Sequence, residues 1–438
     1  MTTNMKSGRR IFSLVRRLLD FVDNWIGPAA PVLAALSLPL QAWSQPCPVP
    51  AAVNDTQCTV APGSTVNATV ANGTALNATD AMGQNTANGI AVNLNNTGTT
   101  GAFAQQGASI VFNGSTLNAT AGALNSASGR VGLRANGSGS SITADGVSIK
   151  MGLTSAVGAN LVGVLARAGG LVSVNGAIEM FSNANGTGIV GVRAADAGSR
   201  VTMSSGSISV TSRGAVGAFA DTGGTVELGN GVTVTSSGAQ TSGTAPRGSH
   251  ALWAAGPGAL LTGTGVNAST SGTLASAARA ELGGIVRLSN SMLSATGAGS
   301  AAVFAAGAAA ASGGQLVLDG STVSATQQFG YGVLVQGTGS SASLINTQIA
   351  ASGNRSIALN VIGGGAATLA NSTVTSASDG TTGGSAVVLD GSRSSATLTN
   401  TQVLAAPTTP TVAYGVRALS GASVTVNGGR GATQPRGV

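Results

Sequence analysis

Short stretches in which apolar and polar residues alternate recur along most of the chain. A first stretch of the type Val-x-Leu starts at residues 110, 142, 172, 201, 226, 260, 286, 316, 342, 367, 396 and 424, at intervals of 25 to 34 residues. A second alternating stretch follows five to seven residues after most of these starts, and a third follows after a variable gap. Because a period of two residues is typical of a strand, each repeat predicts three short strands.

The residues between the first and second stretch are Asn-Gly, Asp-Gly, Ser-Gly or Asn-Ser, which tolerate a left-handed backbone and so predict one tight turn. Three strands, one tight turn and loops of variable length describe one coil of an all-β parallel β-helix, and we expect about 12–13 coils. Val, Leu, Ile and Ala would stack inside, and the intervening Ser, Thr and Asn would face water. A disordered Gly/Ser/Thr-rich chain is the main alternative, but it would lack the regular apolar alternation.

Composition supports this architecture. The 438 residues include 67 glycines, with 3% aromatic and 8% charged residues, which excludes a coiled coil and a highly charged disordered tail. No run of 18 apolar residues occurs, so no membrane-spanning helix is expected in the mature chain.

The net charge of +7 does not indicate a polyanionic partner. The first 45 residues carry +3, and the remaining +4 is spread over nearly 400 residues without a basic stripe or interleaved aromatics. We therefore expect no nucleic-acid partner.

The N-terminus has the order of a secretory signal. Residues 6–17 are basic, residues 26–40 are mostly apolar, and Ala42 and Ser44 supply small side chains at the cleavage positions −3 and −1. We predict a signal peptide over residues 1–44, recognised by the Sec export machinery and cleaved between Ser44 and Gln45, with cleavage after Ala42 as the alternative.

Two cysteines, Cys47 and Cys58, lie in a Pro-rich segment directly after the predicted cleavage site. In an oxidising periplasm we expect them to form a disulfide, which would stabilise the fold by about 2–3 kcal/mol. Two thiols without a nearby histidine make only half of a metal site. Residues 45–63 are therefore interpreted as an N-terminal cap or linker.

A long signal followed by coils of the type G-x-x-V-x-L-x-(N/D)-(G/S)-x-V-x-A resembles the passenger domain of bacterial autotransporters, the pertactin-like group of type V secretion. Residues 284–295 and 314–325 are the clearest instances. The resemblance implies a right-handed β-helix over residues 64–428, exported through the periplasm to the bacterial surface or outer membrane, or secreted. It also implies an outer-membrane β-barrel translocator, which is missing after the tail at residues 429–438. We expect either a truncated or separately encoded passenger, or loss of the barrel.

Few residues could carry chemistry. His250 is the single histidine and lacks a hydrolase nucleophile motif, so we interpret it as structural, in a loop or at a strand edge. The eleven carboxylates after residue 45 are well separated in sequence, although stacking could bring Asp196 near Asp221. We expect solvated turn carboxylates, and predict no catalytic, metal-binding or cofactor-binding residue.

Three functions remain open. The first is a non-enzymatic surface passenger that contributes to virulence by adhesion, autoaggregation or host interaction. Its partner would be a host surface protein or glycan, or a second copy of the chain through self-association. Binding would use a solenoid face or the lengthened segments at residues 236–246 and 271–280. The second is a carbohydrate-active β-helix that acts on polysaccharides, whose groove needs clustered carboxylates and aromatic platforms. The third is a passive surface spacer.

Overall fold

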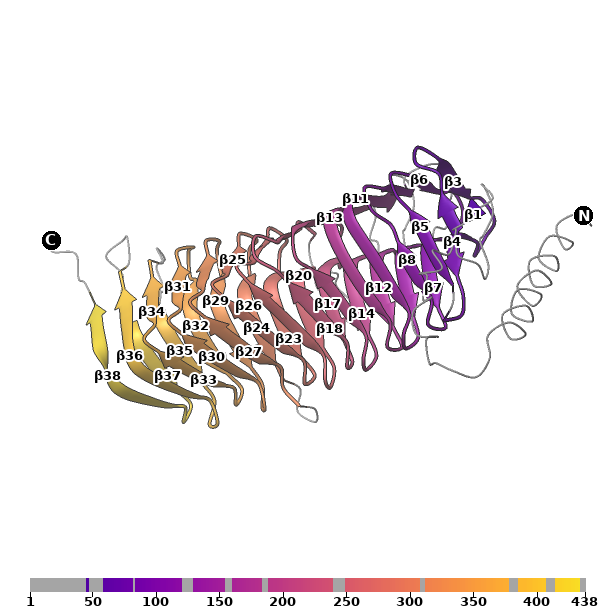
Figure 1. Ribbon diagram of the computed structural model, residues 1–438. Helices are drawn as coiled ribbons and strands as arrows, with labels where there is room; N and C mark the ends of the chain where they lie inside the picture. Colours follow the sequence, from indigo (N-terminus) through magenta and orange to yellow (C-terminus); the bar gives the residue numbers. More distant parts are fainter. Residues whose placement is uncertain are drawn as a thin grey trace, which may run out of the picture. The chain divides into compact units, whose positions relative to one another are not determined.

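The chain forms strands and turns throughout the part that the structure describes. The computed structural model describes residues 45–46, 58–81, 83–119, 129–153, 160–182, 188–238, 249–307, 312–377, 385–406 and 414–433. Within these ranges there are 38 strands and no helix, and the strands follow one another in chain order along a solenoid (Figure 1). The predicted signal peptide, its cleavage bond and Cys47 lie outside the described ranges or at their border.

One sheet, sheet B, receives a single strand from each coil. Neighbouring strands of sheet B are parallel and come from consecutive coils. Its strands are β4 (Thr74–Ala78), β7 (Thr100–Gln105), β10 (Val131–Asn136), β12 (Val162–Arg167), β14 (Val190–Ala195), β17 (Val216–Asp221), β20 (His250–Ala255), β23 (Ser276–Glu281), β26 (Ala301–Ala306), β29 (Tyr331–Gln336), β32 (Ile357–Ile362), β35 (Ser385–Asp390) and β37 (Tyr414–Leu419).

The second sheet, sheet A, consists of two adjacent columns of parallel strands. Column 1 contains β1 (Gln45–Pro46), β2 (Cys58–Val60), β5 (Gln84–Ala87), β8 (Ser109–Val111), β15 (Arg200–Met203), β18 (Thr225–Leu228), β21 (Leu260–Thr264), β24 (Ile285–Ser289), β27 (Gln315–Asp319), β30 (Ser341–Ile345) and β33 (Ala366–Ala370). Column 2 contains β3 (Thr65–Ala68), β6 (Ala91–Leu94), β9 (Thr116–Ala119), β16 (Gly206–Thr211), β19 (Thr233–Ser236), β22 (Asn267–Thr270), β25 (Met292–Ala295), β28 (Thr322–Ala325), β31 (Gln348–Ala351) and β34 (Thr373–Ser376). Four long strands run through both columns: β11 (Ser141–Leu153), β13 (Leu171–Ser182), β36 (Ser395–Ala405) and β38 (Ser423–Thr433).

Most coils thus contribute one strand to sheet B and one strand to each column of sheet A, and in four coils the two strands of sheet A are joined into one long strand. This arrangement confirms the predicted all-β parallel β-helix. The solenoid has about 12 turns. The stretches that start at residue 110 and beyond fall on strands of column 1, and coils of the same kind already stack from Cys58 onward.

The core is a stack of small and medium aliphatic side chains. Equivalent positions of consecutive coils are in register, as in Ile142 beside Val172 and Val172 beside Val201, and all three side chains are buried. Because a parallel strand places alternate side chains on opposite faces, Val, Leu, Ile and Ala at every second position are enough to fill this interior.

The prediction that Ser and Thr face water is wrong at the turns. A column of hydroxyl side chains is buried there: Ser115, Ser291, Ser321, Thr347, Ser372 and Thr401. The backbone N–H of Ser291 donates to Ser321 Oγ at 3.2 Å, and Ser321 Oγ donates to the backbone oxygen of Asp319 at 3.0 Å. The hydroxyls satisfy backbone groups that the tight turn leaves without a strand partner, which explains why polar residues are buried here.

Glycine is required where column 1 passes to column 2 in two coils. Gly206 has a φ of +115°, and a Cβ on it would collide with the backbone oxygen of Gly176 one coil earlier. Gly176 itself has a φ of +139° and meets the backbone of Val147 in the same way. No other residue type fits this combination of backbone angle and close approach.

Candidate functional site

The outer face of sheet B carries side chains that do not belong to the core. In β14, Val192 and Ala194 are part of the main core, and Arg193 between them points to the opposite face with its side chain 35% exposed. Val190, at the start of the strand, belongs to a second apolar cluster that is separate from the core. The same alternation holds for the neighbouring strands of sheet B.

This second cluster, here called the outer-face cluster, is built from equivalent positions of consecutive coils. Val131, Val162, Val190 and Val216 pair in register across β10, β12, β14 and β17. The cluster is completed by Trp253 and Ala255 of β20, with Leu165 and Phe219 packed against it. Its members are only 3–8% exposed, so it is a second buried apolar cluster, separate from the stacked core and on the opposite face of sheet B.

Arginine and aromatic side chains form a row beside the valines. The row is in register over eight strands and reads Phe103, Arg134, Leu165, Arg193, Phe219, Trp253, Arg279 and Phe304.

Contacts within this row are specific. Phe219 and Trp253 stack with ring centroids 4.5 Å apart and planes inclined by 13°. The Arg193 guanidinium carbon lies 5.4 Å from the Phe219 ring centroid, and Arg279 lies 4.7 Å from that of Phe304. Both geometries fall in the range of a cation–π interaction, which fixes the orientation of the arginines on the face.

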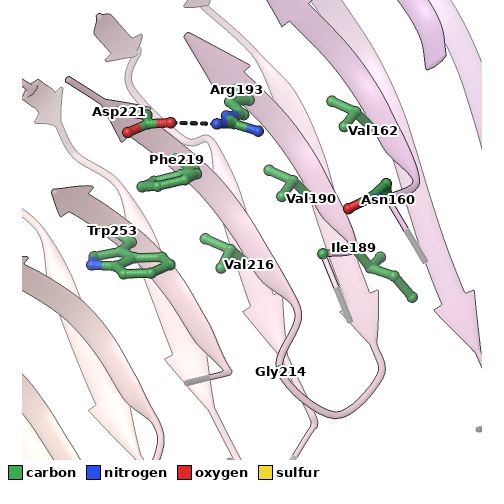
Figure 2. Close-up of a pocket in the computed structure, with 11 residues that line it drawn as sticks. Asn160, Val162, Ile189, Val190, Arg193, Gly214, Val216, Phe219, Asp221 and Trp253 are labelled. Atoms are coloured by element: carbon green, nitrogen blue, oxygen red, sulfur yellow. Dashed lines mark hydrogen bonds and ion pairs between the residues drawn. The ribbon is translucent and has the colours of Figure 1, made fainter. Parts of the chain in front are cut away.

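A cavity of about 290 Å³ lies within the outer-face cluster. Figure 2 shows Val162, Val190 and Val216 on neighbouring strands, with Phe219 and Trp253 on one side and the joined pair of Arg193 and Asp221 on another. The cavity therefore combines an aliphatic surface, an aromatic wall and one ion pair.

Three arginines of this face are paired with carboxylates. Arg193 bonds Asp221, the last residue of β17, and Thr222 Oγ1 donates to the same carboxylate at 3.1 Å. Two coils further on, Arg279 Nε donates to Glu281 at 2.9 Å. Asp196 follows β14 and bonds Arg167 Nε at 3.1 Å. Asp196 and Asp221 thus come from adjacent coils, as the sequence suggested, but each carboxylate is held by a different arginine.

His250 is not in a loop; it is the first residue of β20 and is fully buried. It occupies the position equivalent to Val216 and contacts Trp253 edge-on, with ring centroids 5.5 Å apart. Neither ring nitrogen has a hydrogen-bond partner among the described residues. Burial, and secondarily the charge of Arg279, hold the pKa of His250 well below 6.5.

The remaining sequence-based candidates are placed as follows. Cys58 is buried in β2 and its Sγ lies 3.3 Å from Asn85 Oδ1, but Cys47 lies outside the described residues, so the disulfide stays a prediction. Residues 271–280 are not an inserted loop, because residues 276–280 belong to β23 in the interior of sheet B. Residues 239–246 of the other lengthened segment lie outside the described ranges.

The outer-face cluster and its cavity are not among the sequence-based candidates. The signal is present in the third strand of each coil, where the fourth residue of the strand is Arg193, Phe219, Trp253, Arg279 and Phe304 in five consecutive coils. Aromatic residues are few in the chain, but three of them, Phe219, Trp253 and Phe304, fall on this one line.

The described ranges contain no group of three or more His, Cys, Asp or Glu side chains that could hold a metal ion. No helix of sufficient length and hydropathy to cross a membrane occurs in them either.

Comparison with known proteins gives structural similarity only. No family model and no curated protein sequence matches the chain. A chain in the cryo-EM structure of the Vag8–C1 inhibitor complex is 17% identical, with a TM-score of 0.44 over 87% of this chain and 96% of that chain. The crystal structure of a TibC-catalysed hyper-glycosylated TibA fragment is 14% identical, with a TM-score of 0.25 over 74% of this chain and 99% of that chain.

Proposed function

We propose that this chain is an exported β-helix passenger of the autotransporter type that acts at the cell surface by binding, in adhesion, autoaggregation or host interaction. The observation that carries the proposal is the cavity at the outer-face cluster, on the face of sheet B that is turned away from the stacked core. The N-terminal sequence, with its basic, apolar and small-residue segments, supports export through the Sec machinery, and the resemblance to autotransporter passengers implies a barrel translocator.

Binding explains the face better than catalysis does. The carboxylates next to the cavity and on the neighbouring strands, Asp221 and Glu281, are each engaged by an arginine, and His250 is buried with a lowered pKa. General acid–base catalysis needs a titratable group within reach of the substrate and poised near the working pH. A binding face needs only shape, apolar area and a few oriented polar groups, and weak contacts gain strength when many copies act together on one surface.

The test is to display residues 45–438 on a non-adherent Gram-negative cell by fusion to a heterologous barrel. We expect increased adhesion to host cells or increased autoaggregation relative to cells that display the barrel alone. Phe219→Ser, which alters the outer-face cluster, should reduce this effect. Met292→Ser, which alters a 61% exposed apolar side chain on column 2, should leave it intact and serves as the matched control.

Two outcomes would contradict the proposal. Unchanged adhesion and aggregation with the folded passenger on the surface would favour a passive spacer. Cleavage of a polysaccharide that is abolished by Asp221→Asn or His250→Ala would favour the carbohydrate-active alternative.

A further inference from the structure

We propose that the cavity of the outer-face cluster is a binding site for one neutral pyranose unit of a glycan, held by Arg193 and Asp221 against Phe219 and the valines. This inference rests on the proposed binding function and names its site and its ligand class.

The size of the cavity favours a small ligand. At about 290 Å³ it lies just below the usual range of small-molecule pockets, roughly 300–1,000 Å³. It suits a single sugar ring or one comparable group, and it is too small for a secondary-structure element of a protein partner.

A peptide strand would also find no backbone partner here. The strands below the cavity, β12, β14, β17 and β20, each pair with a neighbouring strand on both sides. Strand addition requires a free edge, so the backbone of this part of sheet B has no hydrogen bonds to offer to a peptide.

The polar groups at the cavity match hydroxyls. The guanidinium of Arg193 donates only, and the carboxylate of Asp221 accepts only. Their side chains are 35% and 23% exposed, so both groups are accessible from the cavity that they line. A hydroxyl both donates and accepts, and two adjacent hydroxyls of a sugar could accept from Arg193 and donate to Asp221 at once. A carbonyl or an aliphatic group could use only one partner or neither.

The charge of the site favours a neutral ligand. Arg193 and Asp221 compensate each other, so the pair attracts neither an anion nor a cation strongly. The apolar C–H face of a pyranose fits the other lining groups, namely Val162, Val190 and Val216 and the ring of Phe219.

An unsatisfied donor beside the cavity supports a ligand that brings acceptor oxygens. Trp253 lines the cavity, is only 8% exposed, and its indole N–H has no hydrogen-bond partner among the described residues. The Nε of Arg193 is buried without a partner in the same way. Buried donors without acceptors are unfavourable, so an acceptor oxygen that reached Arg193 Nε would be stabilised there. The indole nitrogen of Trp253 is turned away from the valines of the cavity (Figure 2) and supports the site less directly.

The full chain with Trp25→Phe and Trp43→Phe has Trp253 as its single tryptophan, so its fluorescence reports directly on the cavity. The probes are the methyl glycosides of glucose, galactose, mannose and N-acetylglucosamine, with methyl glucuronide as the charged comparison. We expect at least one neutral glycoside to change the emission saturably in the millimolar range. Asp221→Asn should weaken this binding about tenfold, and Phe219→Leu about fivefold.

Matched controls exist on the same face. Glu281→Gln changes the equivalent carboxylate two coils away, and Phe304→Leu changes an equivalent aromatic outside the outer-face cluster. Both should leave the binding constant within about twofold, because changes away from the contact are nearly neutral. Circular dichroism of each variant checks that the solenoid is folded.

Three results would overturn the proposal: no response to any neutral glycoside up to its solubility, equal binding by the Asp221 and Phe219 variants, or markedly tighter binding of the glucuronide. The proposed function fails independently of the sugar site. Adhesion without glycoside binding would remove only the pyranose site, whereas glycoside binding without adhesion or aggregation would remove only the adhesive function.

Discussion

The buried histidine should make the solenoid sensitive to mild acid. His250 is fully buried at the start of β20, and its pKa lies well below 6.5 because burial, and then Arg279, disfavour the charged ring. In the unfolded chain the same ring has an ordinary pKa near 6.5. Below pH 6.5 the unfolded state therefore binds a proton that the folded state does not, and the free energy of unfolding falls as the pH falls.

The size of the effect follows from this difference. Each pH unit below 6.5 costs up to about 1.4 kcal/mol until the pKa of the folded state is reached. Between pH 7 and pH 5 the loss from this one group is therefore at most about 2 kcal/mol. Asp221 on β17 and the Arg279–Glu281 pair on β23 are the charged groups of the neighbouring strands.

The perturbation is His250→Val, because valine occupies the equivalent position in β10, β12, β14 and β17. The assay is urea unfolding at pH 7, 6 and 5, followed by Trp253 emission in the chain that carries Trp25→Phe and Trp43→Phe. We expect the valine variant to be more stable than the parent. The difference between their free energies of unfolding should increase from pH 7 to pH 5, by up to about 2 kcal/mol. Ser276→Ala, at the equivalent position of the next coil, should keep the parent's pH dependence. If the difference in free energy of unfolding between the His250→Val variant and the parent were the same at pH 7, 6 and 5, the reasoning would be refuted.

Three further predictions concern the turns and the N-terminus. Ser321→Ala should lower the free energy of unfolding by about 1–3 kcal/mol, because the backbone N–H of Ser291 loses its buried acceptor. The control Ser392→Ala, at an exposed position, should change it by less than about 0.5 kcal/mol. Equal urea midpoints for the two variants would show that the buried hydroxyls do not stabilise the turns. Gly206→Ala should lower the free energy of unfolding by more than about 2 kcal/mol, whereas Gly231→Ala, whose added Cβ meets nothing within 4 Å, should lower it by about 1 kcal/mol. Similar losses of stability in the two variants would show that the backbone at Gly206 adjusts to a side chain. Expression in a Gram-negative host should yield periplasmic protein without residues 1–44, and intact-mass analysis that finds Met1 retained would reject the signal peptide.

The fold could be predicted because it depends on a local pattern that every coil repeats. Alternation at positions such as Val172 and Val201 identifies a strand and its inward face without any knowledge of the partner strand. The buried hydroxyls could not be predicted in this way. Ser321 lies in a turn, where period-two alternation no longer assigns a face, and its burial follows from the Ser291 amide of the preceding coil.

The contacts within the candidate site could not be predicted for a different reason, although the row of arginines and aromatics is visible in the third strands. Phe219 and Trp253 are 34 positions apart, and their contact depends on the register between two coils of unequal length. The lengths of the connections vary from coil to coil, so periodicity alone does not determine which residue of one coil lies on which residue of the next. Conversely, Asp196 and Asp221 were correctly assigned to adjacent coils, but the arginines that hold them could not be identified without that register.

The in-register stacking of sheet B makes the solenoid a molecular ruler. Consecutive strands of a sheet are about 4.8 Å apart, so two outer-face side chains separated by n coils lie about n times that distance apart. Each coil contacts mainly its two neighbouring coils. Deleting or duplicating one whole coil would therefore change this distance by one strand spacing, while the remaining coils keep their contacts. An engineer could therefore set the spacing of two binding groups in steps of a few ångströms by counting coils, with no redesign of the interior.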